Sequence, residues 1–315
     1  MKKALLVVLT LCIAFGAAAA IAAEYPTKPV TIIVASNPGG GTDTMARLFA
    51  KFAEKHFPQP FVINNIDGAG GQRGFEALSR ARKDGYTIGT LYTPHLTAHI
   101  SAKRARYTLD DFATLYNFVT DPGVLVVPAS SPFHSIQDII DAEKAAPGTL
   151  TGSDSGPGSD DAFARAQFND ATGCDVKGVP ATGSSNQKAT VMGGHVSMGF
   201  MNLSQIETNM RAGEVRILAM MTHERHPNVP EIPTFKELGF SVFSDSSRGF
   251  AAPAGLPEDI YKKLVETFEK VMADPEFMEA AKEQLELNFM NPEQYRTYLE
   301  NLLKVTNAAY EKDPW

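Results

Sequence analysis

The sequence has little cysteine, no excess of positive charge and only one long hydrophobic run. Its 315 residues include 2 cysteines, and 29 basic side chains stand against 36 acidic ones, a formal net charge of −7. Nucleic-acid-binding proteins usually present a basic face, so this balance argues against a nucleic-acid partner. The composition, 43% hydrophobic and 21% charged, excludes disordered, collagen-like and coiled-coil chains. A globular chain of this length is expected to form two domains.

The long hydrophobic run lies at the N-terminus. Lys2 and Lys3 precede an uncharged apolar stretch, residues 4–23, which ends in Ala-Ile-Ala-Ala. A charged start, an apolar middle and a small-residue end are typical of a secretory signal peptide, so we expect export and cleavage after Ala22 or Ala23. An uncleaved anchor helix is the alternative, because the stretch is just long enough to span a bilayer. Cleavage would leave Cys174 as the one cysteine and exclude an internal disulfide.

Apolar runs rich in β-branched residues alternate with amphipathic helical patterns along the rest of the chain. Strands are expected at 30–35, 61–63, 86–91, 124–127, near 150, at 196–201, 215–221 and 249–253, and helices at about 45–53, 71–81, 136–145, 159–171, 185–192 and within 258–311. Such alternation is typical of parallel α/β sheets covered by helices. Because no flexible linker separates the two series, we expect two α/β domains joined by crossing strands, with a hinge and a cleft.

Three strand-to-helix connections are rich in glycine. They are residues 36–43 (SNPGGGTD), 67–74 (DGAGGQRG) and 152–159 (GSDSGPGS). Glycine lets the backbone approach a ligand closely, and the start of the following helix offers free N–H groups and a partial positive charge to an anion. Three such loops beside parallel strand ends favour a carboxylate or phosphate cleft. In the alternative reading the glycines only serve the turns, and Thr42 and Ser159 cap the helices.

Signatures of catalysis, nucleotide binding and metal binding are missing. Arg73 stands where the GxGxxG pattern that starts at Gly68 needs its third glycine, and the chain has no Gly-Lys-Ser/Thr P-loop. Ser155 does not lie in a GxSxG turn. His95 and His99 are spaced to share a helix face, but a zinc site needs more ligands. We therefore expect no cofactor, no metal and no catalytic residues, and favour a binding protein over an exported α/β enzyme.

Short segments along the chain carry a family resemblance. They are 25–30 (YPTKPV), 38–43 (PGGGTD), 64–71 (NNIDGAGG), 84–87 (DGYT), 125–128 (LVVP), 230–234 (PEIPT) and 252–255 (APAG). In this order they resemble the substrate-binding proteins of tripartite tricarboxylate transporters, also called the Bug family of periplasmic receptors. The resemblance covers essentially the whole chain beyond the signal peptide.

The resemblance implies a two-domain Venus-flytrap receptor of the periplasmic binding protein class, without catalytic activity. Residues 24–122 plus 246–315 would form domain 1 and residues 123–245 domain 2, each a mainly parallel sheet flanked by helices, with the ligand in the interdomain cleft. Such a receptor would act in the periplasm as a monomer, capture a di-, tri- or aromatic carboxylate and deliver it to a membrane permease with a large and a small subunit. A sensor that presents its loaded form to a signalling partner is the alternative.

The resemblance also implies where the ligand binds. One carboxylate would be held by the first two glycine loops through backbone groups and waters, and domain 2 would close over it. The candidate binding residues are Ser36, Asn37, Gly39, Gly40, Thr42, Asp43, Ala69, Gly70, Gly71, Gln72, Thr93, Ser155, Ser159, Asp160, Ala181, Thr182 and Asn202.

This chain departs from the family pattern around the expected pocket. Ser36 stands where the family often has an aromatic residue, and Ala181 and Thr182 replace a tyrosine and a lysine, which predicts a roomier and more polar pocket. Arg73 and Arg248 are candidate partners for a distal acid group, because a guanidinium pairs with a carboxylate through two hydrogen bonds. The alternative is that both are solvated surface arginines.

Overall fold

The computed structural model describes residues 25–156, 158–181, 183–312 and 314–315, so the expected signal peptide and Thr182 lie outside the described residues. In chain order the elements are β1 (Val30–Val34), α2 (Gly41–Ala53), β2 (Phe61–Asn65), α3 (Gln72–Ser79), β3 (Thr87–Tyr92), α4 (His95–Ser101), a 3₁₀ turn (Leu109–Asp111), β4 (Phe112–Pro128), α5 (Ile136–Ala145), β5 (Thr151–Asp154), α6 (Asp160–Thr172), β6 (Lys177–Pro180), α7 (Ser184–Met192), β7 (Met198–Asn202), α8 (Leu203–Arg211), β8 (Val215–Met220), β9 (Asp245–Pro253), α9 (Glu258–Ala273), α10 (Pro275–Lys282), β10 (Leu287–Met290) and α11 (Pro292–Lys312).

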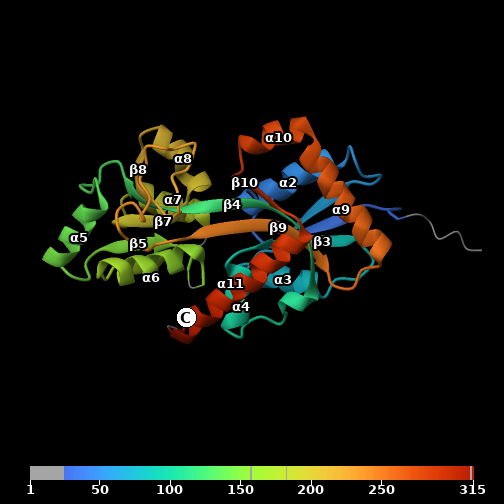
Figure 1. The fold of residues 1–315 in the computed structure, drawn as a ribbon, viewed down its shortest axis with the longest axis horizontal. Helices are drawn as coiled ribbons and strands as arrows, with labels where there is room; N and C mark the ends of the chain where they lie inside the picture. Colours follow the sequence, from blue (N-terminus) through green and yellow to red (C-terminus); the bar gives the residue numbers. More distant parts are fainter. Residues whose placement is uncertain (1–24, 157, 182, 313) are drawn as a thin grey trace, which may run out of the picture.

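Two sheets share the long strand β4 and divide the molecule into two lobes (Figure 1). Lobe 1 contains the sheet β2-β1-β3-β9-β4, with β10 also paired to β4, and lobe 2 contains the sheet in which β4 pairs with β7 and β8, and β7 continues to β5 and β6. The change of sheet falls between Pro122, which pairs with Asp245, and Gly123, which pairs with Asn202. The predicted domain boundaries fall at this point, and a division into two moving domains stays a prediction.

The sheets are mixed, whereas the sequence pattern predicted mainly parallel ones. The pairs β1–β2, β1–β3, β5–β6 and β5–β7 are parallel, but β9 is antiparallel to β3 and β4, and β4 is antiparallel to β7, β8 and β10. The difference has a topological cause. β4 and β9 pass between the lobes in opposite directions and pair with each other along most of β9, so both sheets receive an antiparallel strand.

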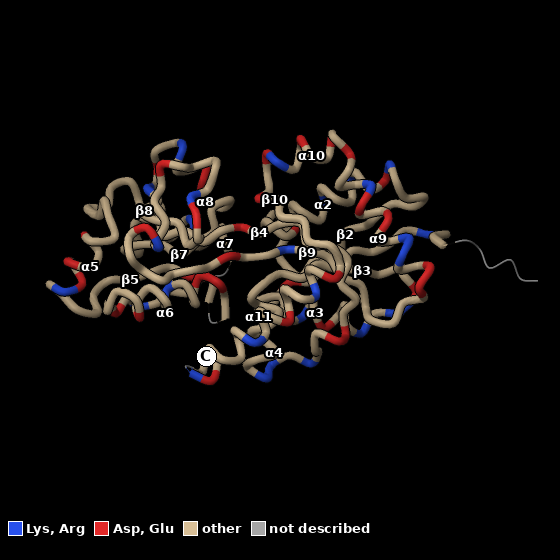
Figure 2. The backbone as a smooth tube through the Cα atoms, viewed as in Figure 1, with Lys and Arg blue, Asp and Glu red and all other residues tan. Residues whose placement is uncertain are grey.

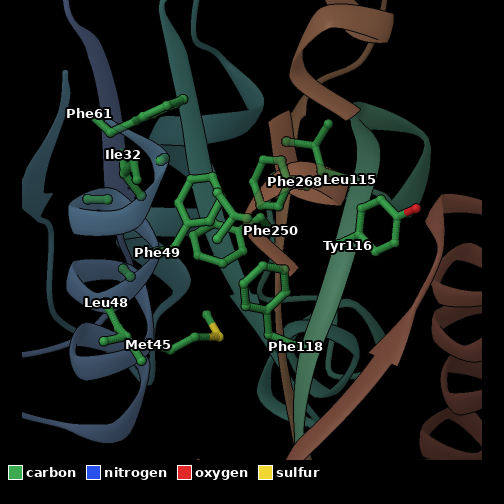
Figure 3. Close-up of a cluster of buried hydrophobic side chains, with 14 of the residues drawn as sticks. Ile32, Met45, Leu48, Phe49, Phe61, Leu115, Tyr116, Phe118, Phe250 and Phe268 are labelled. Carbon is green, nitrogen blue, oxygen red and sulfur yellow. The ribbon is translucent and has the colours of Figure 1, made fainter. Parts of the chain in front are cut away.

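Aromatic side chains form the centre of the lobe 1 core. The apolar face of α2 packs on the sheet, and its Phe49 stacks on Phe268 of α9 with ring centroids 4.1 Å apart (Figure 3). Phe118 of β4 and Phe250 of β9 contact both rings edge-on or tilted. Each such pair adds about 0.5–1.5 kcal/mol to the free energy gained by burial. This core therefore anchors both crossing strands to lobe 1.

Each lobe buries side chains on both faces of its sheet. In lobe 1, α2, α9 and α10 cover one face and α3, α4 and α11 the other (Figure 1). In lobe 2, α5 and α6 pack on one face and α7 and α8 on the other. Among the described residues, the buried apolar side chains form four separate clusters, and none of these spans the two lobes. The lobes are thus joined mainly by β4 and β9.

Of the two residues expected to cap helices, Ser159 does so and Thr42 does not. Ser159 caps α6, since its Oγ accepts the Ala162 N–H at 3.0 Å. Thr42 does not cap α2, because Gly40 occupies the N-cap position and Thr42 already lies inside the helix.

Within the described ranges no helix is both long and apolar enough to cross a bilayer. Figure 2 shows basic and acidic residues interspersed along the backbone of both lobes.

Candidate functional site

The first two glycine loops lie at one edge of the lobe 1 sheet. Residues 35–40 follow β1 and lead into α2, and residues 66–71 follow β2 and lead into α3. β1 and β2 are parallel neighbours in register from Val30 and Phe61 onward, so their carboxyl ends meet at the same edge. In open α/β sheets this edge is where ligands bind.

Asp43 fixes the shape of the first loop. Its Oδ2 accepts the Gly39 N–H and the Arg47 Nε–H, both at 2.8 Å, and its Oδ1 accepts Asn65 Nδ2 at 2.9 Å. The same Asn65 amide donates to Ser36 O at 3.0 Å. Burial opposes ionisation of Asp43, but these hydrogen bonds outweigh it and lower its pKa. Asp43 therefore stabilises the conformation of the first loop, and both of its carboxylate oxygens already accept hydrogen bonds from the protein.

The second loop is tightly wound and packs against α4. Gly70 and Gly71 have φ values of +59° and +84°, in the left-handed region that favours glycine. A Cβ added to Gly70 would lie 3.2 Å from His95 Cδ2, and one added to Gly71 would lie 2.5 Å from Tyr92 Oη. His99 Nε2 lies 3.0 Å from Gly70 O. The two histidines thus share one side of α4, as their spacing suggested, and form a wall of the second loop.

Burial keeps His95 neutral. Burial first, and then the nearby charges of His99 and Arg248, lower the pKa of His95 to about 3. The His95 Nδ1 is buried and has no hydrogen-bond partner among the described residues, and the same holds for Ser36 Oγ in the first loop. Two polar atoms beside the glycine loops are therefore left without a protein partner in the described part of the chain.

Arg248 is buried where the first loop meets the crossing strands. The residue is 6% exposed, and its Nη1 donates to Asp121 Oδ2 at 3.0 Å. A Cβ added to Gly41, the first residue of α2, would lie 3.2 Å from the same Nη1. The guanidinium thus packs against the start of α2, and the surface alternative is wrong for Arg248. Arg73 is exposed and its side chain lies over Gly68.

Asp121 connects this arginine to lobe 2. Its Oδ1 accepts the Ser204 N–H at 3.0 Å and its Oδ2 accepts the Ser204 hydroxyl as well as Arg248. The carbonyl oxygen of Asp121 accepts Asn202 Nδ2 at 3.3 Å. Asp121 of β4 therefore joins Arg248 of β9, which packs beside the first loop, to the start of α8.

The third loop places two buried acids at the start of α6. Asp160 Oδ2 accepts Asn202 Nδ2 at 2.7 Å, and Asp161 accepts the hydroxyl of Ser155. Burial raises the pKa of Asp160 to about 7, although Asn202 and Arg248 oppose the shift. Burial, followed by the charge of Asp160, raises the pKa of Asp161 well above its usual range. Sequence reasoning included Asp160 and missed Asp161, its neighbour in the same first turn.

The third loop meets lobe 1 directly. A Cβ added to Gly158 would lie 3.0 Å from Ala98 Cβ of α4 and 3.1 Å from Trp315 Nε1. The Trp315 ring contacts Phe163 of α6 edge-on at 4.9 Å. A groove of about 960 Å³ also runs along the boundary between the lobes, with α6 on one side and α11 on the other. The second and third loops therefore both pack against α4, whereas Asp160 is the one predicted site residue among the described ones that lines the groove.

The other predicted site residues fall into three groups. Asn37, Gly39, Ala69 and Gly70 are exposed, whereas Ser36, Gly40, Gln72, Ser155 and Ala181 are half-buried and Thr42, Gly71, Thr93 and Asn202 are buried. Thr93 Oγ1 accepts the Ser247 N–H at 3.0 Å, and Gln72 Nε2 donates to Arg104 O at 2.7 Å, so both side chains serve the fold. Tyr92, His95, His99 and Asp121 were missed as site residues. The histidine spacing was noticed but was weighed only as a zinc site.

The donor set does not suit a metal. Within the ranges that the structure describes, no cluster of three or more histidine, cysteine, aspartate or glutamate side chains is placed to hold an ion. The site instead offers backbone N–H groups, one arginine and several buried hydrogen-bonding side chains.

Sequence comparison matches the chain to one family over most of its length. The model of TctC, the tripartite tricarboxylate transporter family receptor, matches residues 45–312. A UPF0065 protein in the gbd 5′ region of Cupriavidus necator is 30% identical over 296 residues, covering 94% of this chain and 90% of its own. Protein BugT of Bordetella pertussis is 31% identical over 232 residues, covering 72% of this chain and 71% of its own.

Solved structures agree with this match. A structure described as a periplasmic transporter is 28% identical, with a TM-score of 0.84 over 91% of this chain and 98% of its own. R. palustris Rpa4515 with adipate is also 28% identical, with a TM-score of 0.81 over 92% of this chain and 97% of its own. The expected fold class, a two-lobed α/β periplasmic binding protein, is confirmed.

Proposed function

Because the chain belongs to the tripartite tricarboxylate transporter receptor family, which includes the Bug proteins, we propose that it captures a small organic carboxylate and delivers it to a membrane permease. This family membership confirms the resemblance that the short sequence segments indicated. It also removes the exported enzyme from the alternatives, since the family is one of binding proteins. The adipate in the R. palustris structure supports the ligand class.

One observation carries the proposal. The start of α2 and the buried guanidinium of Arg248 meet at Gly41, next to the tightly wound second loop. A helix start concentrates unpaired N–H groups and partial positive charge, and a buried arginine adds a formal charge. An anionic group bound there would receive hydrogen bonds from both, while Ser36 Oγ and His95 Nδ1 offer further polar atoms.

The remaining parts of the proposal concern location and motion. We place the protein in the periplasm, because residues 1–23 have the pattern of a signal peptide and the fold matches a periplasmic transporter. A monomer with two domains, divided near Pro122 and Asp245, would close over the ligand. Its permease would have a large and a small subunit, as the family resemblance implies.

A thermal-shift screen tests the proposal. The protein without residues 1–23 is heated with millimolar mono-, di-, tri- and aromatic carboxylates, each against sulfate at equal ionic strength. A ligand at 100 times its Kd stabilises the folded state by about 2.7 kcal/mol, which raises the Tm by several degrees. An unchanged Tm with every carboxylate would remove the proposed ligand class. Permease genes beside this gene would support delivery, whereas sensor genes there would favour the signalling alternative.

A further inference from the structure

The groove between α6 and α11 is a cavity separate from the first two glycine loops. Its volume is about 960 Å³, and side chains of both lobes line it. Apart from Asp160, no described residue of the predicted carboxylate site lines the groove, and none comes from residues 36–43 or 67–74. Clefts of about 300–1,000 Å³ are typical of sites for small molecules. The groove is therefore large enough to hold a small organic molecule of its own.

Apolar and aromatic side chains form the walls of the groove. On the lobe 2 side, the ring of Phe163 contacts Trp315 edge-on at 4.9 Å, and the ring of Phe243 stacks on His223 with centroids 4.1 Å apart. On the α11 side, Val305 lines the groove and is 63% exposed. Covering apolar surface of this kind with an apolar ligand lowers the free energy. The walls therefore suit the apolar body of a ligand.

Carboxylates outnumber amines along the same groove. The described side chains with acidic or basic groups that line it are Asp160, Asp170, Asp245, Glu286, Lys312, His223 and His226. Asp170 is paired with Lys312 at 2.6 Å, and Glu286 with His226 at 3.1 Å. Four carboxylates thus stand against one amine and two imidazoles. The charge of the groove is complementary to a cation and not to another carboxylate.

Asp245 is a lining carboxylate with a free oxygen. Its Oδ1 accepts the Tyr298 hydroxyl at 3.1 Å, whereas its Oδ2 has no partner among the described residues. Loss of hydration in the groove, and then the charge of Asp121, raise the pKa of Asp245, although the hydrogen bond from Tyr298 opposes the shift. A cation beside Oδ2 would favour the ionised carboxylate and form a charge-assisted hydrogen bond with it.

We propose that the groove is a second binding site and that it takes a protonated amine on an apolar body, an alkylammonium or arylalkylammonium ion. The ammonium group binds at Asp245, and the apolar part lies between α6 and α11. The aromatic walls add to the attraction, because the faces of aromatic rings attract cations. The inference does not depend on the proposed carboxylate function.

Ligands of matched shape test the proposal. The protein without residues 1–23 is titrated by calorimetry at pH 8, where alkylamines are protonated, with hexylammonium, 1-hexanol and methylammonium. Hexylammonium should bind at least about tenfold more tightly than hexanol, which lacks the charge, and than methylammonium, which lacks the apolar body. From butyl- to octylammonium the affinity should rise about fourfold per methylene, which corresponds to about 0.8 kcal/mol per buried CH₂. Equal affinities for hexylammonium and hexanol would overturn the cation, and no binding of hexylammonium would overturn the site.

Variants identify the group that binds the ammonium ion. Asp245→Asn should weaken hexylammonium binding at least about tenfold and leave hexanol binding within about twofold. Tyr298→Phe keeps the ring and the Asp245 carboxylate, so hexylammonium binding should stay within about threefold. Asp141→Asn, which changes an exposed acid on α5, is the matched control, and equal Tm values show that the variants are folded. Unchanged hexylammonium binding by Asp245→Asn would contradict the assignment to this carboxylate, and the ligand series in the wild type tests the cation even where a variant is unstable.

One further variant separates this site from the proposed carboxylate site. Gly40→Val changes the first glycine loop, none of whose described residues lines the groove, so hexylammonium should bind as it does to the wild type. Loss of hexylammonium binding in Gly40→Val would place the amine in the carboxylate site and overturn the second site. Failure of the amines leaves the carboxylate receptor standing, and failure of every carboxylate in the thermal-shift screen leaves the amine site standing.

Discussion

The buried polar side chains around the loops form two groups. In one group the hydrogen-bonding atoms already have partners within the protein, and in the other some of these atoms have none among the described residues. Asp43 and Thr93 have their acceptors occupied by neighbouring backbone or side chains. Arg248, His95 and Ser36 keep polar atoms without a partner among the described residues. A buried polar atom costs free energy unless a partner satisfies it. The second group therefore marks where ligand atoms gain most from binding.

Two glycine substitutions should separate binding from stability. Gly40 has an extended backbone and only Asn37 O, at 3.6 Å, near an added Cβ, so Gly40→Val should change the free energy of unfolding by less than about 0.5 kcal/mol. Gly70→Val forces a left-handed φ on a β-branched residue beside His95 and should cost about 1–3 kcal/mol. Both should abolish carboxylate binding in calorimetry. Normal binding by Gly70→Val would place the second loop outside the site.

Asp43→Asn should loosen the first loop. The amide retains one acceptor oxygen and loses the charge that pairs with Arg47, so urea unfolding should show a loss of about 1–3 kcal/mol, together with weaker ligand binding. Asp110→Asn is the control, because Asp110 forms an exposed pair with Arg296 that is worth at most about 1 kcal/mol. Equal losses for the two variants would contradict the role assigned to Asp43.

Elements with a strong local pattern were predictable, and elements defined by distant partners were not. α5 was predicted with the bounds that it has, and α2 was recognised from its apolar face. The pattern missed α4, α8, β6, β10 and the first half of β4. α4 and β10 are short, and β10 exists through its pairing with β4. A strand's stability depends on its cross-strand neighbours, which local sequence does not reveal.

The same distinction applies to the site. The glycine loops could be found because turn chemistry is local. The walls around the loops could not be predicted from spacing, because His95 belongs to α4 and Arg248 to β9, which lie far apart in the sequence. Arg248 was weighed as a ligand partner, but its burial beside Asp121 follows from the crossing of β4 and β9. Tertiary packing alone supplies that contact.

Because burial of His95 on α4 lowers the pKa of this histidine, we expect the free energy of unfolding to depend on pH. The folded-state pKa of His95, about 3, lies below the unfolded value of about 6.5. The folded protein therefore binds fewer protons than the unfolded chain between these values, and this contribution to stability is full above about pH 6.5 and is lost as the pH falls toward 3. Asp160, with a pKa raised to about 7, acts in the opposite sense between about pH 4 and 7.

His95→Asn should isolate the histidine contribution. Urea unfolding at pH 5 and pH 7.5 should show a smaller gain in stability with rising pH for the variant than for the wild type, because the titrating group is gone. His134→Asn removes an exposed histidine of lobe 2 and should leave the wild-type pH dependence. A pH dependence that His95→Asn leaves unchanged would mean that His95 does not titrate on unfolding.

At the scale of the molecule, the two lobes have separate cores and few strong contacts with each other. Beyond β4 and β9, the contacts between them include the pair of Lys312 with Asp170, the pair of His226 with Glu286, and the ring of Trp315 against Phe163. The pair of Lys312 with Asp170 is exposed and therefore contributes at most about 1 kcal/mol. A groove of about 960 Å³ along the boundary leaves much of it unpacked. We therefore expect rotation about the crossing strands to cost little free energy.

A ligand that contacts both lobes should shift the protein toward a closed form. It favours that form by the difference between its affinities for the two states, so small-angle scattering should show a smaller radius of gyration when a saturating carboxylate is added. Trp315, the single tryptophan of the chain, lies on the boundary against Phe163, and its fluorescence should change in parallel. Trp315→Phe should lose the optical signal and keep the change in scattering. An unchanged radius of gyration at saturation would mean that the pocket is already closed before the ligand binds, and that selection then rests on the walls of the site alone.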